Sequence, residues 1–307
     1  MTKILGISAY YHDSAAALVC DGEIIAASHE ERFSRIKHDS SFPKNSINFL
    51  LNSNSLTLKD IDYVVFYEKP ILKFNRLIET YISNAPKGFK SFKKAIPLWV
   101  KDKLFQKNTI IKNLREFYSN FDEKKLLFTD HHLSHAASAF YPSPFEEAVI
   151  LTLDGVGEWT TTSIRIGKKN KIELMDEIYY PHSIGLLYSA FTYYTGFKVN
   201  SGEYKVMGLA PYGEPIFKDL IINNLIDLKE DGSFRLNQKF FDYSTGLTMV
   251  NDKFLKLFGQ KRRLPEKNLE RFHMNVAASI QAVTEEVIIK ITRHLFEKYK
   301  IENLCLA

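Results

Sequence analysis

The sequence contains the same strand–turn–strand plan twice, once in residues 3–31 and again in residues 148–179. In each copy an apolar strand leads through a polar turn into a second strand, and a tight connection leads into a third. Asp21-Gly22 and the Gly-Lys-Lys-Asn run at residues 167–170 suit such hairpin connections. The predicted strands lie at residues 4–8, 15–20, 23–28, 148–153, 160–166 and 171–178. A chain built on this repeat is expected to form two similar three-stranded meanders.

A helical pattern follows each meander, starting near Pro43 in the first copy and near Ser183 in the second. Strands followed by helices, twice over, predict an α/β fold with two similar lobes, residues 1–145 and 146–307. This plan resembles the two-lobed ASKHA architecture of actin, sugar kinases and the Hsp70 ATPase, whose lobes are ribonuclease H-like. The resemblance implies that the turn after the first strand of each lobe faces a shared cleft and contacts phosphates. Fold likeness by itself does not name a reaction.

Positive charge is concentrated between Lys69 and Arg115, where 12 basic residues are opposed only by Glu79 and Asp102. This stretch therefore carries +10, and because the whole chain carries +5, the remainder carries −5. Aromatic and aliphatic residues recur between the lysines, as they do on helices with one packed and one solvated face. We expect a basic helical insertion at about residues 69–120 whose solvated face attracts an anionic substrate, rather than a nucleic-acid-binding surface.

Composition excludes several other classes of protein. Hydrophobic residues make up 45% of the 307, enough for a large core, yet the longest apolar runs are far too short to span a bilayer. The N-terminus enters a strand pattern at once, without the basic start and long apolar stretch of a signal peptide. Cys20 and Cys305 lie in apolar strand-like segments and are expected to be reduced core residues of a cytoplasmic protein.

Three histidines, at positions 131, 132 and 135, follow a short apolar strand and open an alanine-rich helix. His131 and His135 are four residues apart, so both imidazoles project from one helical face, as two ligands of one metal ion require. His132, three residues before His135, is a geometric substitute. Three of the chain's nine histidines fall within five residues. This density favours a metal site over a polar helix start in which one histidine caps or packs.

Asp154 ends the first strand of the second copy and precedes a glycine turn. A carboxylate there would complete the metal shell, while Gly155 and Gly157 allow the backbone to approach a phosphate and point N–H groups at it. An ordinary hairpin turn is the alternative. His12 occupies the corresponding turn of the first copy, where it would deprotonate an acceptor hydroxyl or orient a transferred carbonyl group. An exposed turn histidine is the alternative there.

Two further segments contain candidate ligands. Residues 200–213 are dense in glycine and are predicted to form a nucleotide-contacting loop that includes Gly208. Lys205 would oppose a phosphate and Glu203 would contact a ribose hydroxyl or a metal-bound water; the segment is neither a Walker nor a Rossmann motif, and a structural crossover is the alternative. In the polar connection at residues 30–43, Arg35 and Lys37 would clamp an anionic group, unless that connection is a plain surface loop.

Five of these motifs together resemble the nodulation-type and antibiotic-tailoring O-carbamoyltransferases. They occur in the family's order over nearly the whole chain, at residues 6–17, 30–38, 130–139, 153–158 and 202–213. The resemblance implies a domain similar to the ATPase that makes threonylcarbamoyl-adenosine in tRNA, normally followed by a YrdC-like domain. In such enzymes carbamoyl phosphate and ATP give carbamoyl-adenylate, and the carbamoyl group then passes to a hydroxyl of a sugar or antibiotic.

The resemblance also assigns roles to residues. His131, His135 and Asp154 would hold a divalent metal, iron or zinc, near the nucleotide phosphates. His12 would lie beside the carbamoyl group as the base, and Lys37 and the 202–208 segment would line the nucleotide or acceptor cleft. The expected partners are ATP, carbamoyl phosphate and a small-molecule hydroxyl acceptor, with no membrane and no nucleic acid.

Members of this family run several hundred residues longer, so the second lobe is expected to be unfinished at residue 307 and the YrdC-like domain to be absent. The chain alone would then not perform the full reaction, and a C-terminal half on another chain would be a partner. One rival interpretation is a non-catalytic nucleotide- and metal-binding module of such a split complex. Another is an ASKHA-type small-molecule kinase, against which the imidazole pair argues, because that kinase needs magnesium on carboxylates.

Overall fold

The computed structural model describes residues 1–100 and 104–307, which divide into two compact units. The first comprises residues 1–75 and 96–134, and the second comprises residues 76–95 and 135–307. Lys101, Asp102 and Lys103, part of the predicted basic insertion, lie outside the described residues. The sequence places a boundary near residue 145, whereas the structural division falls after Ser134. The reason is that most of helix α6 (His131–Phe140) packs with the strands of the second unit.

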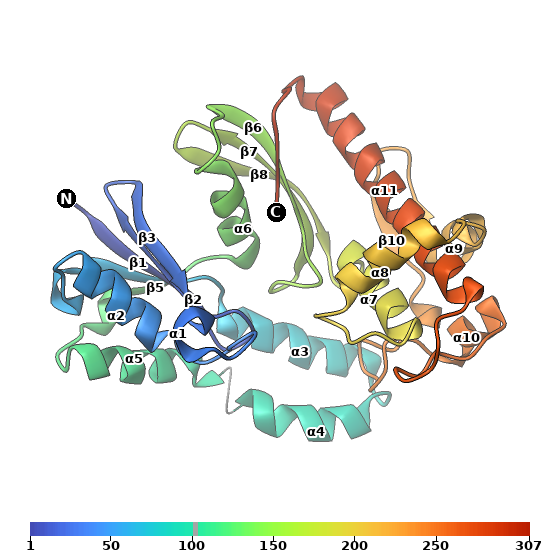
Figure 1. The fold of residues 1–307 in the computed structure, drawn as a ribbon, viewed down its shortest axis with the longest axis horizontal. Helices are drawn as coiled ribbons and strands as arrows, with labels where there is room; N and C mark the ends of the chain where they lie inside the picture. The colour runs from blue at the N-terminus through green and yellow to red at the C-terminus, as the bar shows by residue number, and fades with distance from the viewer. Residues whose placement is uncertain (101–103) are drawn as a thin grey trace. The chain divides into compact units, whose positions relative to one another are not determined.

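The first unit contains a five-stranded mixed sheet in the order β3-β2-β1-β4-β5 (Figure 1). Its strands are β1 (Lys3–Ser8), β2 (Ala15–Cys20), β3 (Glu23–His29), β4 (Tyr63–Phe66) and β5 (Leu126–Phe128). The first three form the antiparallel meander, and β4 and β5 add in parallel beside β1. The three strands predicted for the first copy are confirmed to within one residue.

One face of this sheet forms the core of the first unit. Leu5 of β1 and Leu18 of β2 are fully buried, and alternate residues of both strands are only partly covered, as the period of two requires. Helices α2 and α5 supply the opposing apolar side chains, including Ile47 and Ile110. The other local elements are α1 (Glu31–Ser34), α2 (Lys44–Ser53), η1 (Leu58–Asp60), α5 (Gln106–Phe117) and η3 (Glu123–Lys125).

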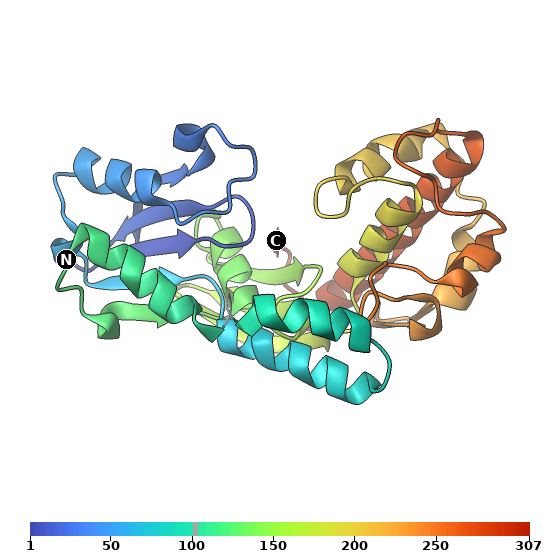
Figure 2. The ribbon, with the colours of Figure 1, turned by 90° about the horizontal axis from the view of Figure 1, so that it is seen from below.

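Helices α3 (Pro70–Asn84) and α4 (Phe89–Trp99) form a hairpin (Figure 2), in which Tyr81 meets Phe92 edge to face with ring centroids 5.2 Å apart. With α5 they occupy the described part of the predicted basic insertion. Its cations are not all solvated, because Lys73 and Arg76 are only 8% and 5% exposed. The prediction of solvated basic faces is wrong for these two residues, whose partners belong to the site described below.

The second unit repeats the plan of the first. Its main sheet has the order β11-β6-β7-β8, with β6 to β8 antiparallel and β11 parallel to β6, so within the described residues it has four strands where the first sheet has five. The strands are β6 (Glu147–Leu153), β7 (Thr160–Lys168), β8 (Lys171–Tyr179) and β11 (Leu304–Leu306), and a separate hairpin contains β9 (Ile226–Leu228) and β10 (Phe234–Leu236). The three strands predicted for the second copy are confirmed.

Strand β6 is buried on both faces, which explains its uninterrupted apolar sequence. Val149 and Leu151 belong to the larger core of the unit, whereas Ala148 and Ile150 pack with α6 in a smaller one. This smaller core fixes α6 against β6, the strand that Asp154 follows directly. The position of a histidine-bearing helix is therefore set directly by a neighbouring strand.

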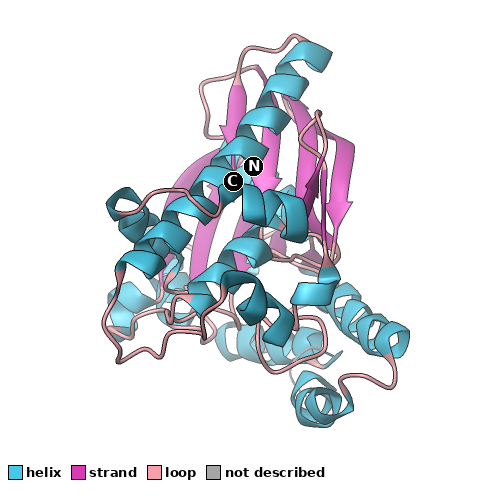
Figure 3. Cartoon of the chain, turned by 90° about the vertical axis from the view of Figure 1, so that its right-hand side faces the viewer, coloured by secondary structure: helices cyan, strands magenta, loops and turns pink. Residues whose placement is uncertain are grey.

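Helices cover the larger core of the second unit, and α11 packs along α7, α8 and α9 (Figures 1 and 3). They are α7 (Ile184–Tyr194), α8 (Glu203–Leu209), η4 (Ala210–Tyr212), α9 (Lys218–Leu225), η5 (Gln238–Phe240), α10 (Asp252–Phe258) and α11 (Arg271–Tyr299). The helix predicted near Ser183 is confirmed, with the Ser183 hydroxyl accepting the Leu186 N–H at the start of α7. None of the described helices combines the length and apolar content needed to cross a bilayer.

Both cysteines are free thiols in strands. Cys305 is buried in β11, as predicted for a core residue, whereas Cys20 is only half-buried at the end of β2.

Acidification is expected to destabilise the second unit through His182. The Nδ1 atom of His182 accepts the backbone N–H of Leu236 at 3.1 Å, which requires an unprotonated ring nitrogen. Burial, and then the charge of Arg235, lower the pKa of His182 from its ordinary value of 6.5. Below pH 6.5 the unfolded chain therefore binds more protons than the folded chain. The contribution of neutral His182 to the free energy of unfolding is complete above pH 6.5 and is lost as the pH falls below that value.

Urea unfolding between about pH 7.5 and pH 5 measures this effect. The free energy of unfolding should fall more steeply with acidification in the wild type than in His182→Gln, whose amide does not titrate. Parallel pH profiles would show that His182 does not contribute.

Candidate metal centre

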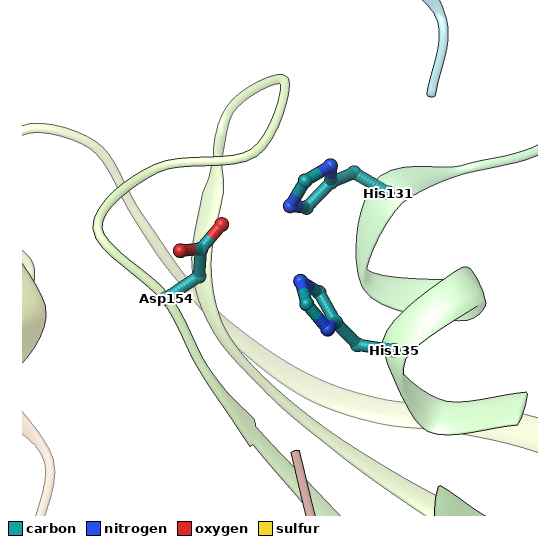
Figure 4. A group of neighbouring side chains, drawn as sticks. All are labelled: His131, His135 and Asp154. Atoms are coloured by element: carbon teal, nitrogen blue, oxygen red, sulfur yellow. The ribbon is translucent and has the colours of Figure 1, made fainter. Parts of the chain in front are cut away.

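Helix α6 presents His131 and His135 on the same face. The carboxylate of Asp130 accepts the N–H of Leu133 at 3.1 Å, which satisfies a donor in the first turn of the helix. Farther along, Ala136 and Phe140 are buried against β6 and fix the rotation of the helix. Since His131 and His135 are one turn apart, this rotation directs both imidazoles to the end of β6 (Figure 4).

Asp154 follows β6 directly, in a turn that its neighbours hold tightly. Its own Oδ1 accepts the Gly155 N–H at 2.6 Å, and its carbonyl oxygen accepts the Ser183 hydroxyl at 2.9 Å. Gly185 approaches so closely that a Cβ there would lie 2.8 Å from the same carbonyl oxygen. These contacts with Ser183 and Gly185 at the start of α7 therefore hold the backbone of Asp154 in place.

The structure brings His131, His135 and Asp154 together. One ligand atom from each residue lies within 4.8 Å of the other two, and the three side chains point toward one another (Figure 4). Ligand bonds of about 2.0–2.2 Å allow two ligands of one ion to be at most about 4.4 Å apart, so small side-chain shifts suffice to enclose an ion. His132, the geometric substitute, is fully buried and is not part of this group.

Glu68 lies behind His131, and no sequence pattern above predicts it. Its side chain is fully buried, with Oε2 3.7 Å from His131 Nδ1 and bonded to the Nζ of Lys73. Metal-binding histidines commonly direct their second ring nitrogen to such a carboxylate, which fixes the ring. The proximity of Glu68 to His131 follows from the sheet topology, because β4 and β5 are parallel neighbours. Residues that follow them, such as Glu68 and His131, emerge at the same sheet edge.

Arg76 braces the turn that follows Asp154. Its guanidinium donates to the carbonyl oxygens of Gly157 and Glu158 at 2.6 and 2.8 Å, and its centre lies 5.4 Å from the centroid of the Tyr180 ring. The sequence indicates only a basic helical residue at this position. A buried cation that donates to two carbonyls of one turn instead stabilises the shape of that turn.

The glycines of this turn differ from the prediction in one respect. The Gly155 N–H donates to Asp154 Oδ1, and the Gly157 N–H donates to the Thr160 carbonyl at 3.0 Å. Both donors are therefore engaged within the turn rather than directed outward to a phosphate. Close approach of a ligand to a backbone without Cβ atoms remains the expected contribution of Gly155 and Gly157.

The predicted glycine-dense loop is largely helix α8 (Glu203–Leu209), so the loop prediction is wrong. Val206 and Leu209 are buried three residues apart, a helical spacing that the glycine content obscures. Glu203, the first residue of this helix, ties the preceding segment to α7, because its carboxylate accepts the N–H groups of Asn200 and Gly202 and the hydroxyl of Ser189. A ribose hydroxyl or a metal-bound water, the predicted partners of Glu203, would have to compete with these three hydrogen bonds.

Lys205 and Gly208 lie on the exposed side of α8. The Lys205 Nζ is 5.9 Å from the centroid of the Tyr204 ring, and a Cβ at Gly208 would meet no atom within 4 Å. Both positions are open to solvent, and nucleotide contact there remains a prediction.

His12 and Lys37 are exposed turn residues of the first unit. His12 Nδ1 lies 2.8 Å from Asp13 Oδ2, and the side chain of His12 is 52% exposed. The other oxygen of Asp13 lies 3.0 Å from Nδ1 of His38, a residue that the sequence did not single out. One carboxylate thus links two imidazoles that are far apart in the sequence.

Comparison with known families identifies one that spans almost the whole chain. Residues 3–307 match the family model described as "Carbamoyltransferase N-terminus". An uncharacterized protein of Synechocystis, sll1178, is 59% identical over all of this chain and 50% of its own length. The nodulation protein NolNO of Sinorhizobium fredii is 32% identical over 97% of this chain and 40% of its own length. The chain thus spans half or less of these two curated relatives.

Similarity to a solved phosphatase structure is much lower. The Ppx/GppA phosphatase of Aquifex aeolicus is 11% identical, with a TM-score of 0.34 over 100% of this chain and 95% of that protein.

Proposed function

This chain belongs to the carbamoyltransferase N-terminus family, and on that premise we propose that it forms the N-terminal part of an ATP-dependent O-carbamoyltransferase. The proposed reaction moves a carbamoyl group from carbamoyl phosphate, by way of carbamoyl-adenylate, to a hydroxyl of a sugar or natural product. Family membership supports a transferase. The observation on which the finer proposal depends is the grouping of His131, His135 and Asp154 within 4.8 Å.

The fold proposed for this function is a pair of ASKHA-type lobes. The strand order of the first sheet begins β3-β2-β1-β4, and that of the second is β8-β7-β6-β11, with the same parallel and antiparallel senses. Asp154 follows β6 as the turn that contains His12 follows β1. Chemically important residues therefore occupy equivalent turns of two similar sheets.

The three side chains fit a divalent transition metal. Two imidazoles and one carboxylate suit Fe(II) or Zn(II), whereas magnesium prefers oxygen ligands alone. His131 would be supported from behind by the negative charge of the buried Glu68, whose Oε2 lies 3.7 Å from its Nδ1. A bound ion would supply Lewis-acid polarisation of a phosphate or carbonyl oxygen.

Other residues of the chain have proposed roles of their own. His12 accepts the proton of the acceptor hydroxyl, and its exposure leaves room for that substrate. The exposed cations Lys37 and Lys205 counter phosphate charge. Arg76 holds the shape of the turn that contains Gly155 and Gly157, through the two carbonyl bonds described above.

Nucleotide binding tests the proposal. Equilibrium dialysis with a non-hydrolysable ATP analogue should show binding to the chain loaded with Fe(II) or Zn(II). Because the metal is expected to neutralise phosphate charge, affinity should fall at least about tenfold in Asp154→Ala. His29→Ala, which removes an exposed histidine at the end of β3, should bind as the wild type does.

Binding supported equally by magnesium alone, and unchanged in Asp154→Ala, would contradict the proposal and favour an ASKHA-type kinase. No nucleotide binding under any metal condition would contradict both.

A further inference from the structure

We infer that Asp13 and His38 are positioning residues that hold His12 in its Nδ1–H tautomer, so that Nε2 is the atom that receives the acceptor proton. This inference rests on the proposed function for its chemistry, but its geometry lies entirely within the first unit. Three side chains from two separate turns make up the group, which we call the His12–Asp13–His38 relay.

The backbone that presents the relay is held in an unusual conformation. Asp13 has φ +50°, in the left-handed region that residues other than glycine rarely adopt. The segment that follows His38 holds it there, because the Ser14 N–H donates to the Asp39 carbonyl at 2.8 Å and the Tyr10 N–H donates to the Ser40 carbonyl at 2.9 Å. The fold thus imposes this turn, and the same segment brings His38 to Asp13.

The carboxylate of Asp13 bridges the two rings. Its Oδ2 lies 2.8 Å from His12 Nδ1, and its Oδ1 lies 3.0 Å from His38 Nδ1. Partial burial raises the pKa of Asp13, but hydrogen bonds to His38 and then His12 lower it further, and the net direction is downward. Asp13 therefore remains an anion that can only accept hydrogen bonds.

A proton on each Nδ1 follows from this arrangement. An ionised carboxylate has no proton to donate, so a neutral His12 at 2.8 Å must place its own proton on Nδ1. Its Nε2 then offers a lone pair. The same reasoning assigns Nδ1–H to His38, whose backbone N–H is additionally held by Glu31 Oε2 at 3.2 Å. His38 stabilises the second carboxylate oxygen and limits the rotation of Asp13.

With this tautomer, His12 can take the proton of the acceptor hydroxyl as the carbamoyl group is transferred. The O–H bond of the acceptor breaks, the proton passes to His12 Nε2, and the electron pair stays on the acceptor oxygen. That oxygen bonds to the carbamoyl carbon as the bond from this carbon to the adenylate phosphate oxygen breaks and AMP leaves. The imidazolium formed on His12 is stabilised by the negative charge of Asp13.

Long-range ¹H–¹⁵N NMR of the histidine rings tests this assignment without requiring activity. In the wild-type 307-residue chain, both His12 and His38 should show the Nδ1–H tautomer. In Asp13→Asn the replacing amide offers an N–H, so at least one of the two rings should change to Nε2–H, the form that free imidazole favours. In His38→Gln, His12 should keep Nδ1–H, with a broader population of ring orientations. His29→Gln should alter neither ring.

The inference is overturned if His12 is in the Nε2–H form in the wild type, or if Asp13→Asn leaves both tautomers unchanged. Where transfer to a hydroxyl acceptor is measured, Asp13→Asn should lower kcat by about 10²–10⁴-fold with little change in the acceptor KM. The predicted tautomers together with no nucleotide binding under any metal condition would retain the relay and reject the proposed function. Transfer that is unaffected by Asp13→Asn would do the reverse.

Discussion

His131→Ala is expected to lower the affinity of the chain for Zn(II) or Fe(II) by more than about 100-fold. Substituting a residue that only hydrogen-bonds to a metal ligand typically costs about 10–100-fold, and loss of a ligand itself should cost more. The substitution removes one of three ligands that lie within 4.8 Å of one another, and the other two cannot close the shell. Competition with a chromophoric chelator measures the affinity directly. His135→Ala should cause a loss of similar size, because both imidazoles belong to the same helix face.

The matched control is His29→Ala, which removes an exposed imidazole at the end of β3. Its metal affinity should equal that of the wild type, and circular dichroism should show that all three variants are folded. An affinity unchanged in both His131→Ala and His135→Ala would mean that any bound ion lies elsewhere.

Glu68→Gln is expected to weaken both metal binding and folding. Metal affinity should fall about 10–100-fold, because the substitution removes the negative charge that lies 3.7 Å from His131 Nδ1, behind the proposed ligand. The free energy of unfolding should fall by about 3–5 kcal/mol, because the substitution leaves Lys73 without its carboxylate in a place where that side chain is only 11% exposed. Chelator competition and urea unfolding measure the two effects separately.

Two further variants separate the loss of stability caused by the unpaired Lys73 from the loss of metal affinity caused by the missing carboxylate. Glu116→Gln breaks a Lys–Glu pair with Lys44 whose side chains are 50% and 44% exposed, and it should cost no more than about 1 kcal/mol. Glu68→Gln combined with Lys73→Met removes the buried cation as well. This double variant should recover part of the free energy of unfolding lost in Glu68→Gln, while its metal affinity stays low. Recovery of both properties, or a Glu68→Gln variant as stable and as metal-binding as the wild type, would contradict a positioning role for Glu68.

The sheet framework could be read from the sequence because its signals are local. Apolar runs and polar turns define the two meanders, and the helix start at Ser183 coincides with a side-chain cap. The approach of His131 to His135 is likewise a local consequence of helical geometry. The meeting of this pair with Asp154 could be proposed because Asp154 immediately follows a buried strand.

Contacts between distant segments could not be predicted in the same way. Glu68 reaches His131 only because β4 and β5 pair in parallel, and His38 reaches Asp13 because a left-handed turn is pinned by a later segment. The alternation of apolar and basic residues suggested that the cations at residues 69–115 are solvated, although tertiary partners bury Lys73 and Arg76. In α8 the glycine count obscured the three-residue spacing of Val206 and Leu209, and burial against the core outweighed the weak helix propensity of glycine.

The central claim is that two imidazoles of α6 and the carboxylate after β6 hold one ion. X-ray absorption spectroscopy of the zinc-loaded chain tests it most directly. We predict a shell of nitrogen and oxygen at about 2.0–2.2 Å with scattering from two imidazoles and no sulfur near 2.3 Å. His131→Ala should remove one imidazole from that shell. A shell without imidazole scattering, or one unchanged in His131→Ala, would contradict the account.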